Sequence, residues 1–546
     1  MEIWTRIQSL LLLASAFLFC ATLAAPSDSP RDADAGQSGY VGGDHNVDPA
    51  TASQFQHLWN ASFLPDEKHW ARPLVHTLKS SGRQIVFTAS TENYVRTFDA
   101  VTGEKINERQ ILPPWPMGAA YCTAQVSQNL GIMGTPIIDV ENEVVYLYVK
   151  SYNEDIRIPG GASPPLNAQY YFYVIYIETL WDLYYFPLLI DDIPADNDPR
   201  KIFMGGLVLQ RPALTQIGSV VYAGFGGLCD AFNYTGAIVT VDMSTKYINV
   251  WVTQGGPASP WTADWSAWHG GGAAGIWQAG LGLSSDGKDV YFNIDNGAGS
   301  TEVNGSTTPV SGKTHIDGLS ETAVRVTFNQ STGVQLLDWF RPYDWQTDAG
   351  QDIGSGGVGI LDPTVFTTDA VKRLAVITSS NPRMYVQDLD NLGGYRQGAN
   401  GTDGVLQTIP LAGEVFGGIG SYPHEGGYIY VNPGNTGLQA YKFTPSANAS
   451  ALFSFAGKAS NSNALWGGAG VPTVTSRNGE AGSGVVWITD PNRGLLAYRA
   501  VPQNGSLVEI KLPKVEGAGK FSRPVFGDGR VYVIDGQGRL VALGVK

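Results

Sequence analysis

Several common signals are scarce or missing in this 546-residue sequence. Basic residues are outnumbered: 35 Lys and Arg stand against 49 Asp and Glu, which gives a net charge of −14. Nucleic acids and anionic lipids bind positive fields, so both are excluded as partners. The chain also has no Gly-rich nucleotide loop between a strand and a helix, no zincin motif and no G-x-S-x-G elbow. The corresponding nucleotide-binding, zinc-protease and serine-hydrolase classes are therefore excluded.

Uninterrupted apolar runs are short. Residues 10–19 follow Arg6 and precede the small residues 21–25, which is typical of a secretory signal peptide cleaved near Ala24. The run at residues 170–190 is long enough to cross a bilayer, but it contains two acidic residues and a proline and is predicted to form two paired strands. We expect a secreted, extracellular protein without a membrane span, with a signal peptide at residues 1–24 and a disordered leader at 25–43.

Cysteine is scarce as well. Of three cysteines, Cys20 lies in the signal peptide, which leaves Cys122 and Cys229. An even number of thiols in a secreted protein indicates a disulfide, so this pair is predicted to be bonded. Passage through the secretory pathway also predicts glycosylation at seven Asn-X-Ser/Thr sites. These sites are Asn60, Asn233, Asn304, Asn329, Asn400, Asn448 and Asn504.

What the sequence has in abundance is glycine, with 67 residues, and aromatic side chains, which suit short strands and tight turns. Residues 521–543 contain three strand patterns separated by Gly turns, and similar units recur roughly every 60 residues. Eight such units begin near residues 72, 134, 211, 275, 356, 416, 470 and 521. The predicted fold is all-β: an eight-bladed β-propeller of four-stranded antiparallel blades at residues 44–546.

The last unit contains only three strands. Residues 54–63 have a strand pattern and precede the first unit without belonging to it. We predict that they pair with residues 539–543, since this would complete the eighth blade and remove the open edges of the ring.

The loops differ between the two faces of such a ring. With strands lettered A to D outward from the axis, the B–C and D–A loops share one face, called here the decorated face, and the A–B and C–D turns share the other, the plain face. Function is expected on the decorated face, because the long loops gather there. These loops are residues 151–168, 191–201, 254–272, 297–319 and 342–354.

Four residues of the decorated face are candidates for a site. Trp277 could stack a flat conjugated cofactor, while Asp230, Asn296 and Asp352 offer the oxygen ligands that a hard cation such as Ca²⁺ prefers. Alternatively, Trp277 belongs to the core and the polar residues cap turns. The acidic stretch at residues 191–198 lacks a calcium-loop pattern and is predicted to be a solvated turn.

A family resemblance covers nearly the whole chain after the signal peptide. It is carried above all by LGIMGTPIID, QRPALTQIGSVVYAGFGG and GQDIGSGG, which begin at residues 130, 210 and 350. These motifs resemble the eight-bladed quinoprotein alcohol dehydrogenase-like propellers, and more narrowly their secreted fungal members. The resemblance implies pyrroloquinoline quinone stacked on Trp277, Ca²⁺ bound by Asn296, Asp352 and Asp230, and Asp352 as the catalytic base.

The chain also departs from the family pattern. The family's vicinal cysteine pair is replaced by Tyr121-Cys122, and two cofactor-contacting basic residues are replaced by Ser380 and Thr235. A blade-locking motif of the Asp-x-x-Thr-Gly type has Asn107 where the family has Trp.

Two functions follow from these observations. One is a quinoprotein-like oxidoreductase that acts on an alcohol, a sugar or a specialised metabolite. The other is a non-catalytic propeller that uses the decorated face to bind a protein or a glycan. In both cases a monomer is expected.

Overall fold

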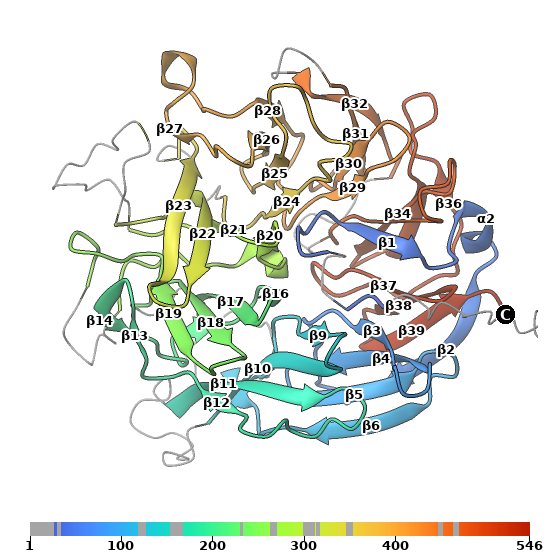
Figure 1. Cartoon of the computed structure of the whole chain (residues 1–546). Helices are drawn as coiled ribbons and strands as arrows, with labels where there is room; N and C mark the ends of the chain where they lie inside the picture. The colour runs from blue at the N-terminus through green and yellow to red at the C-terminus, as the bar shows by residue number, and fades with distance from the viewer. Residues whose placement is uncertain are drawn as a thin grey trace, which may run out of the picture.

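Eight small antiparallel sheets follow one another around a central axis in the computed structural model (Figure 1). The structure describes residues 27–29, 34–117, 127–152, 167–229, 233–261, 270–298, 312, 317–345, 353–445, 451–461 and 469–546. The predicted all-β, eight-bladed propeller is confirmed. No helix among these residues is long and apolar enough to cross a membrane.

Each blade contains an A, B, C and D strand, and most units begin where the repeat placed them. In order from strand A to strand D, blade one contains β3 (Leu74–Thr77), β4 (Gln84–Ala89), β5 (Tyr94–Asp99) and β6 (Lys105–Gln110), and blade two contains β9 (Ile137–Asp139), β10 (Val144–Tyr152), β11 (Ala168–Tyr176) and β12 (Leu188–Leu189). Blade three contains β16 (Thr215–Ile217), β17 (Val220–Gly227), β18 (Ala237–Asp242) and β19 (Ile248–Val252). Blade four contains β20 (Ser284–Ser285), β21 (Val290–Ile294), β22 (Thr322–Asn329) and β23 (Gly333–Arg341).

Blade five contains β24 (Val358–Ile360), β25 (Leu374–Thr378), β26 (Arg383–Asp388) and β28 (Gln407–Pro410), and blade six contains β29 (Gly420–Tyr422), β30 (Tyr428–Val431), β31 (Gln439–Phe443) and β32 (Phe453–Lys458). Blade seven contains β33 (Thr473–Ser476), β34 (Val485–Asp490), β35 (Gly494–Arg499) and β36 (Glu509–Ile510). Blade eight contains β37 (Val525–Gly527), β38 (Arg530–Ile534), β39 (Arg539–Gly544) and β2 (Gln56–Ser62).

Short elements outside this pattern decorate the ring. They are β1 (Tyr40–Asp44), α2 (Pro49–Ala52), β7 (Trp115–Pro116), β8 (Asn129–Leu130), β13 (Pro194–Ala195), β14 (Asp198–Ile202), β15 (Val208–Leu209), η5 (Gln278–Gly280), β27 (Gly394–Tyr395) and η7 (Ala399–Gly401).

The core lies between neighbouring blades. Every residue of the second strand β4 is buried, whereas every residue of the outer strand β6 is exposed or partly buried. Both faces of a blade pack on its neighbours, so its middle strands are apolar on both sides. The run at residues 170–190 forms strands β11 and β12, which pair in antiparallel fashion as predicted.

The ring is closed by the pairing of β2 with β39 (Figure 1), as the sequence predicted. Trp59 of β2 fastens this seam to blade one: its indole N–H donates to the carbonyl of Ala100 (3.3 Å). A Cβ at Gly103, where φ is +74°, would lie 2.5 Å from the indole ring, so only glycine allows this close contact. A tryptophan therefore does lock the Asp99–Gly103 turn, but from the adjacent blade. Asn107 instead donates to the carbonyl of Glu178 in blade two (2.8 Å).

The prediction of a disordered leader at residues 25–43 is wrong for the part that the structure describes. Residues 27–29 and 34–44 run along the inner strands: the N–H of Val75 and the carbonyl of Asp28 lie 2.9 Å apart, and Gly36 accepts a hydrogen bond from Ile360 (2.8 Å). Strand β1 then pairs with β33 in parallel. A short polar segment is ordered here because the inner strands offer unpaired backbone groups.

Five of the predicted glycosylation sites fall within the described residues. All five asparagines are exposed, which a glycan requires. Three of them, Asn329, Asn400 and Asn504, lie at C–D connections of the plain face. Asn304 and Asn448 lie outside the described residues.

Candidate functional site

Trp277 lies in the D–A loop that leads into blade four, next to the short helix η5. Its ring is partly buried against an apolar cluster that includes Trp115 and Leu228. A Cβ at Gly226 would lie 2.4 Å from the indole ring, and one at Gly275 would lie 2.7 Å from its nitrogen. The ring thus rests on bare backbone at the end of β17, which holds it in a defined orientation.

Asn296 follows the B strand of blade four and lies beside the same loop. Its carbonyl accepts a hydrogen bond from Ala274 (2.9 Å), and Asp295 donates to the carbonyl of Gly275 (2.9 Å). The side chain of Asn296 is exposed. The backbone around Asn296 is therefore bonded to the residues that precede Trp277.

Asp352 lies outside the described residues, but the chain immediately after it joins the same layer. Gly354 accepts a hydrogen bond from the N–H of Gln278 (2.9 Å), and Ile353 accepts one from the buried amide of Asn293 (3.0 Å). A Cβ at Gly354 would lie 2.4 Å from the Cα of Asp295. The segments that carry Trp277, Asn296 and Asp352 thus converge through their backbones.

Asp230 also lies outside the described residues, and the chain on both sides of it contacts the Trp277 loop. On one side, Leu228 and Cys229 lie in the apolar cluster against which Trp277 packs. On the other side, Gly236 donates to the carbonyl of Ala273 (2.9 Å). Cys229 is disulfide-bonded, whereas Cys122 lies outside the described residues, so their pairing stays a prediction.

Other acidic residues in the long loops of the decorated face are engaged in the fold. Asp344 forms an ion pair with Arg383 (2.7 Å). The expectation that residues 191–198 form a solvated turn is wrong for Asp198, which is 4 % exposed, and for Asp191, whose carboxylate accepts the N–H of Tyr170 (2.7 Å). Burial raises the pKa of Asp191 to about 7.

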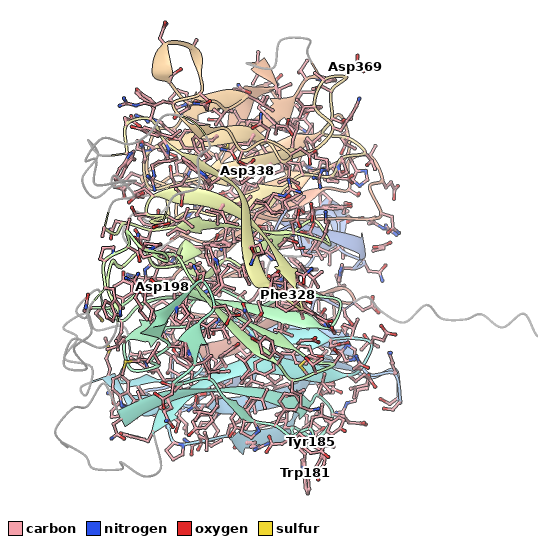
Figure 2. The ribbon with its side chains drawn as sticks, turned by 60° about the vertical axis from the view of Figure 1, so that its left-hand side comes forward. Trp181, Tyr185, Asp198, Phe328, Asp338 and Asp369 are labelled. Carbon is pink, nitrogen blue, oxygen red and sulfur yellow. The ribbon has the colours of Figure 1, made fainter. Side chains whose placement is uncertain are left out.

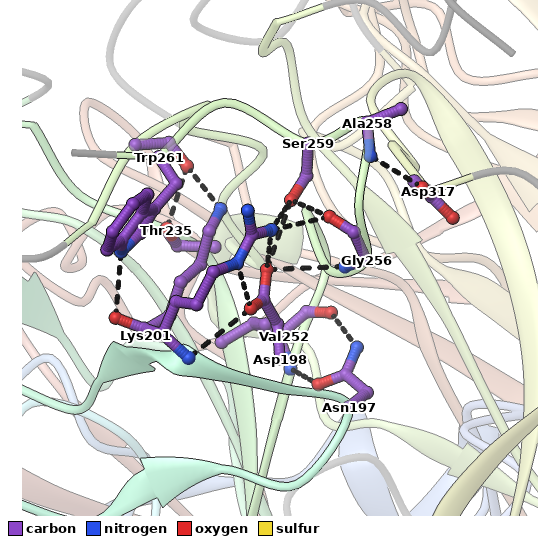
Figure 3. A network of polar contacts seen from close by, with 12 residues as sticks. Asn197, Asp198, Lys201, Thr235, Val252, Gly256, Ala258, Ser259, Trp261 and Asp317 are labelled. Atoms are coloured by element: carbon purple, nitrogen blue, oxygen red, sulfur yellow. Dashed lines mark hydrogen bonds and ion pairs between the residues drawn. The ribbon is translucent and has the colours of Figure 1, made fainter. Parts of the chain in front are cut away.

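A lysine that the sequence did not predict at this site lies beside Thr235. Lys201 of β14 donates from Nζ to the carbonyl of Gly271 (2.8 Å), and the Thr235 hydroxyl donates to the same oxygen (2.8 Å) (Figure 3). Burial lowers the pKa of Lys201 to about 7, although Asp198 opposes this shift. The resemblance implies an arginine at position 235; here an amine from the β13–β14 hairpin occupies the same neighbourhood.

This hairpin is fixed by a polar network (Figure 3). Asp198 binds the guanidinium of Arg200 at two points (2.7 Å each), and Arg200 also donates to the carbonyl of Gly256 (2.6 Å). Asn197 makes paired hydrogen bonds with the backbone of Val252 (2.8 and 2.9 Å). No sequence signal pointed to Lys201, because the contact depends on a hairpin within an irregular connection.

Metal ligands do not gather in the part of the chain that the structure describes: it contains no group of three or more His, Cys, Asp or Glu placed to hold an ion. Asn296 is the one predicted ligand within these residues. Asp230 and Asp352 lie outside them.

No family model matches the chain, and comparison with curated proteins gives no match either. Solved structures do resemble it. The quinohemoprotein alcohol dehydrogenase from Comamonas testosteroni gives a TM-score of 0.61 at 14% identity, covering 95% of this chain and 80% of that one. A quinohemoprotein alcohol dehydrogenase from Pseudomonas putida HK5 gives 0.61 at 12% identity with the same coverage. A europium-containing methanol dehydrogenase gives 0.59 at 13% identity, covering 95% and 98%.

The chain is thus an eight-bladed β-propeller with the fold of the quinoprotein alcohol and methanol dehydrogenases. At these identities the likeness establishes the fold, and function has to be argued from the site.

Proposed function

We propose that this protein is a secreted oxidoreductase of the quinoprotein type. The observation that carries the proposal is the convergence of three segments that are distant in sequence: Gln278, next to Trp277, bonds to Gly354, and Asp295, next to Asn296, bonds to Gly275. These hydrogen bonds bring the segments that carry Trp277, Asn296 and Asp352 together on the decorated face.

The described residues fit the cofactor in part. Trp277 is supported from behind by the glycines at positions 226 and 275 and remains partly exposed, as a stacking platform for a flat ring system requires. The exposed amide of Asn296 offers an oxygen ligand for Ca²⁺, with Asp230 and Asp352 as the proposed carboxylate ligands. Lys201 places an amine close to Thr235, where the resemblance had indicated the loss of a basic residue.

We assign the following roles in the proposed reaction to the chain's own residues. Trp277 would orient the cofactor, and Asp352 would take the proton from the substrate's hydroxyl group as a general base. When bound, pyrroloquinoline quinone supplies the two-electron acceptor and Ca²⁺ the Lewis acid. The substrate class is proposed as an alcohol, a sugar or a specialised metabolite.

Secretion, glycosylation and a monomeric state are part of the same proposal. The apolar segment at residues 10–19 and the exposure of all five described sequon asparagines support passage through a glycosylating route. The disulfide-bonded state of Cys229 is consistent with an oxidising compartment.

A titration of the secreted protein with pyrroloquinoline quinone and Ca²⁺ tests the proposal. We expect a change in the quinone absorbance and a thermal stabilisation, because a ligand at a hundred times its Kd stabilises the fold by about 2.7 kcal/mol. Trp277→Ala should abolish both effects, and Trp181→Ala, which removes an indole far out on the surface, should leave them unchanged. Asp352→Asn should retain the bound quinone but lose turnover.

The second candidate function is a binding propeller without catalysis. It is favoured by the absence of a clustered ligand set among the described residues and by the non-basic residues at positions 235 and 380. If saturating quinone and Ca²⁺ change neither the absorbance nor the melting temperature, this second function replaces the first.

A further inference from the structure

The loop that carries Trp277 has an unusual backbone. Ala273, Ala274 and Ala279 have φ angles of +53°, +61° and +49°, and they are the three alanines with positive φ among the residues that the structure describes. Gln278 has a φ of +46°. Side chains rarely adopt this left-handed region, and alanine has no polar group that could stabilise it locally. The surrounding contacts must therefore hold the loop in this shape, as is typical of strained segments at functional sites.

Gln278 provides the contacts at the centre of the loop. Its side chain is fully buried, and both ends of its amide are used. The Oε1 atom accepts a hydrogen bond from the N–H of Asn293 in β21 (2.9 Å), and the Nε2 atom donates to the carbonyl of Gly282, just before β20 (3.0 Å). One side chain thus joins the loop to both inner strands of blade four.

The backbone of Gln278 reaches a third segment. Its N–H donates to the carbonyl of Gly354 (2.9 Å). The side-chain amide of Asn293, which is also fully buried, donates to the carbonyl of Ile353 (3.0 Å). Residues 353 and 354 are therefore held by Gln278 directly and through Asn293, and they follow Asp352 in the sequence.

The leader braces this arrangement from the other side. The N–H of Gly282 donates to Oε1 of Gln37 (3.2 Å), and a Cβ at Gly282 would lie 2.7 Å from the Nε2 atom of Gln37. Gln37 is itself buried. The segment that accepts the amide of Gln278 is thus enclosed between the loop and the leader, so the leader opposes any displacement of Gly282.

The buried amide of Gln278 does more than fill space. Methionine would occupy a similar volume, but it has no strong donor or acceptor. The hydrogen bonds to Asn293 and Gly282 require a defined direction, and an amide is favourable in the core only while such bonds are made. The side chain of Gln278 is therefore matched to one position of the loop, and with it to one position of the Trp277 ring.

We propose that Gln278 is a positioning residue of the candidate site: it fixes the ring of Trp277 relative to residues 353 and 354, which follow the proposed base. For quinone binding this role rests on the proposed function. The coupling of the two segments can be measured without any cofactor, so each part has its own experiment.

Amide hydrogen exchange of the full-length protein without cofactor measures the coupling. In Gln278→Met, the amides of residues 276–282 and 353–357 should both exchange about tenfold faster than in the wild type, because one side chain holds both segments. Gln387→Met is the matched control. Gln387 is also fully buried, and its amide has no hydrogen-bond partner among the described residues, so its replacement should leave both segments unchanged.

A titration with pyrroloquinoline quinone and Ca²⁺, followed by the quinone absorbance, measures the effect on the site. Gln278→Met should bind the quinone about tenfold more weakly than the wild type. Val386→Ala opens a cavity between blades five and six and lowers the melting temperature, but it should keep the wild-type affinity. Trp181→Ala, which removes an indole that projects beyond the ribbon at the edge of the ring (Figure 2), should also bind like the wild type.

The conservative variant Gln278→Glu should restore binding to within about threefold of the wild type. Burial favours its neutral acid, which offers both a donor and an acceptor in place of the amide. A side chain that only filled space would not distinguish this variant from Gln278→Met.

Unchanged exchange of the two segments in Gln278→Met would overturn the proposal, as would faster exchange confined to one of them. Quinone affinity that falls no further in Gln278→Met than in Val386→Ala would show a merely structural role. If the wild type does not bind the quinone, the proposed function fails, and the exchange alone decides whether Gln278 couples the segments. If Gln278→Met is not secreted, the wild type decides: slow exchange at the N–H groups of Gln278 and Asn293 supports the proposal, and fast exchange overturns it.

Discussion

Asp28 and Arg72 form a buried, two-point ion pair, with Nη1–Oδ1 and Nη2–Oδ2 distances of 3.0 and 2.5 Å. Neither side chain is more than 1 % exposed. Arg72 also donates to the carbonyl of Pro524 (2.9 Å), and Asp28 accepts the N–H of Phe526 (3.0 Å). One carboxylate near the amino terminus thus joins blade one to blade eight.

Asp28→Asn should destabilise the protein by about 3 kcal/mol, because the guanidinium of Arg72 would remain buried without its counter-charge. The free energy of unfolding in urea measures the effect. The control Asp369→Asn changes an exposed carboxylate and should stay within about 0.5 kcal/mol of the wild type. Equal stability of the two variants would show that the leader does not fasten the ring.

Trp59→Ala should cost about 2 kcal/mol, since it removes the ring that rests on Gly103 and the hydrogen bond to Ala100. Deletion of all residues up to 63 should have a larger effect, because it exposes the edge of β39, and the product should aggregate. Size-exclusion chromatography and thermal unfolding report both. Normal secretion and melting of the deletion variant would contradict the role of β2.

Peptide mapping under non-reducing conditions should recover Cys122 and Cys229 as one linked pair. A bridge that closes a loop of about 100 residues stabilises by up to about 4 to 5 kcal/mol when it forms without strain. Reduction should therefore lower the melting temperature. Recovery of Cys122 as a free thiol would disprove the pairing.

Lys201 predicts a specific dependence of stability on pH. Its pKa is about 7 in the folded protein, against 10.5 for an ordinary exposed lysine. Between these values the unfolded chain binds a proton that the native protein does not, so stability rises with pH through this window. The wild type should gain up to about 1.4 kcal/mol per pH unit over Lys201→Met between pH 7 and 10. A constant difference in the free energy of unfolding would mean that Lys201 keeps its proton.

The ring and its seam could be predicted because their signals are local. Buried runs such as β10 and Gly turns such as the one after β37 recur in each unit, and the missing fourth strand pointed to residues 54–63, within which β2 forms. The candidate site stays a prediction: residue types on the decorated face suggested it, and only the resemblance gave Trp277 and Asn296 specific roles, since their spacing alone does not indicate a cofactor.

The leader and the β13–β14 hairpin could not be predicted from the sequence. Both are short and polar, and both owe their order to contacts with distant strands, as the Gly36–Ile360 and Lys201–Gly271 hydrogen bonds illustrate. A local pattern does not contain this information. Trp59 could not be predicted as the residue that locks blade one, because it contacts the Asp99–Gly103 turn from blade eight. The family motif instead places its tryptophan farther along blade one itself.

The seam also has a consequence for the order of events during synthesis. Asp28 and the N–H that it accepts from Phe526 are 498 residues apart in sequence. Synthesis must therefore reach Phe526 before this contact can form, and until then the ring stays open. Such long-range pairing slows folding because loop closure precedes any gain from the contact. We therefore expect a slow late step in folding, in which β37, β38 and β39 complete the ring by pairing with β2.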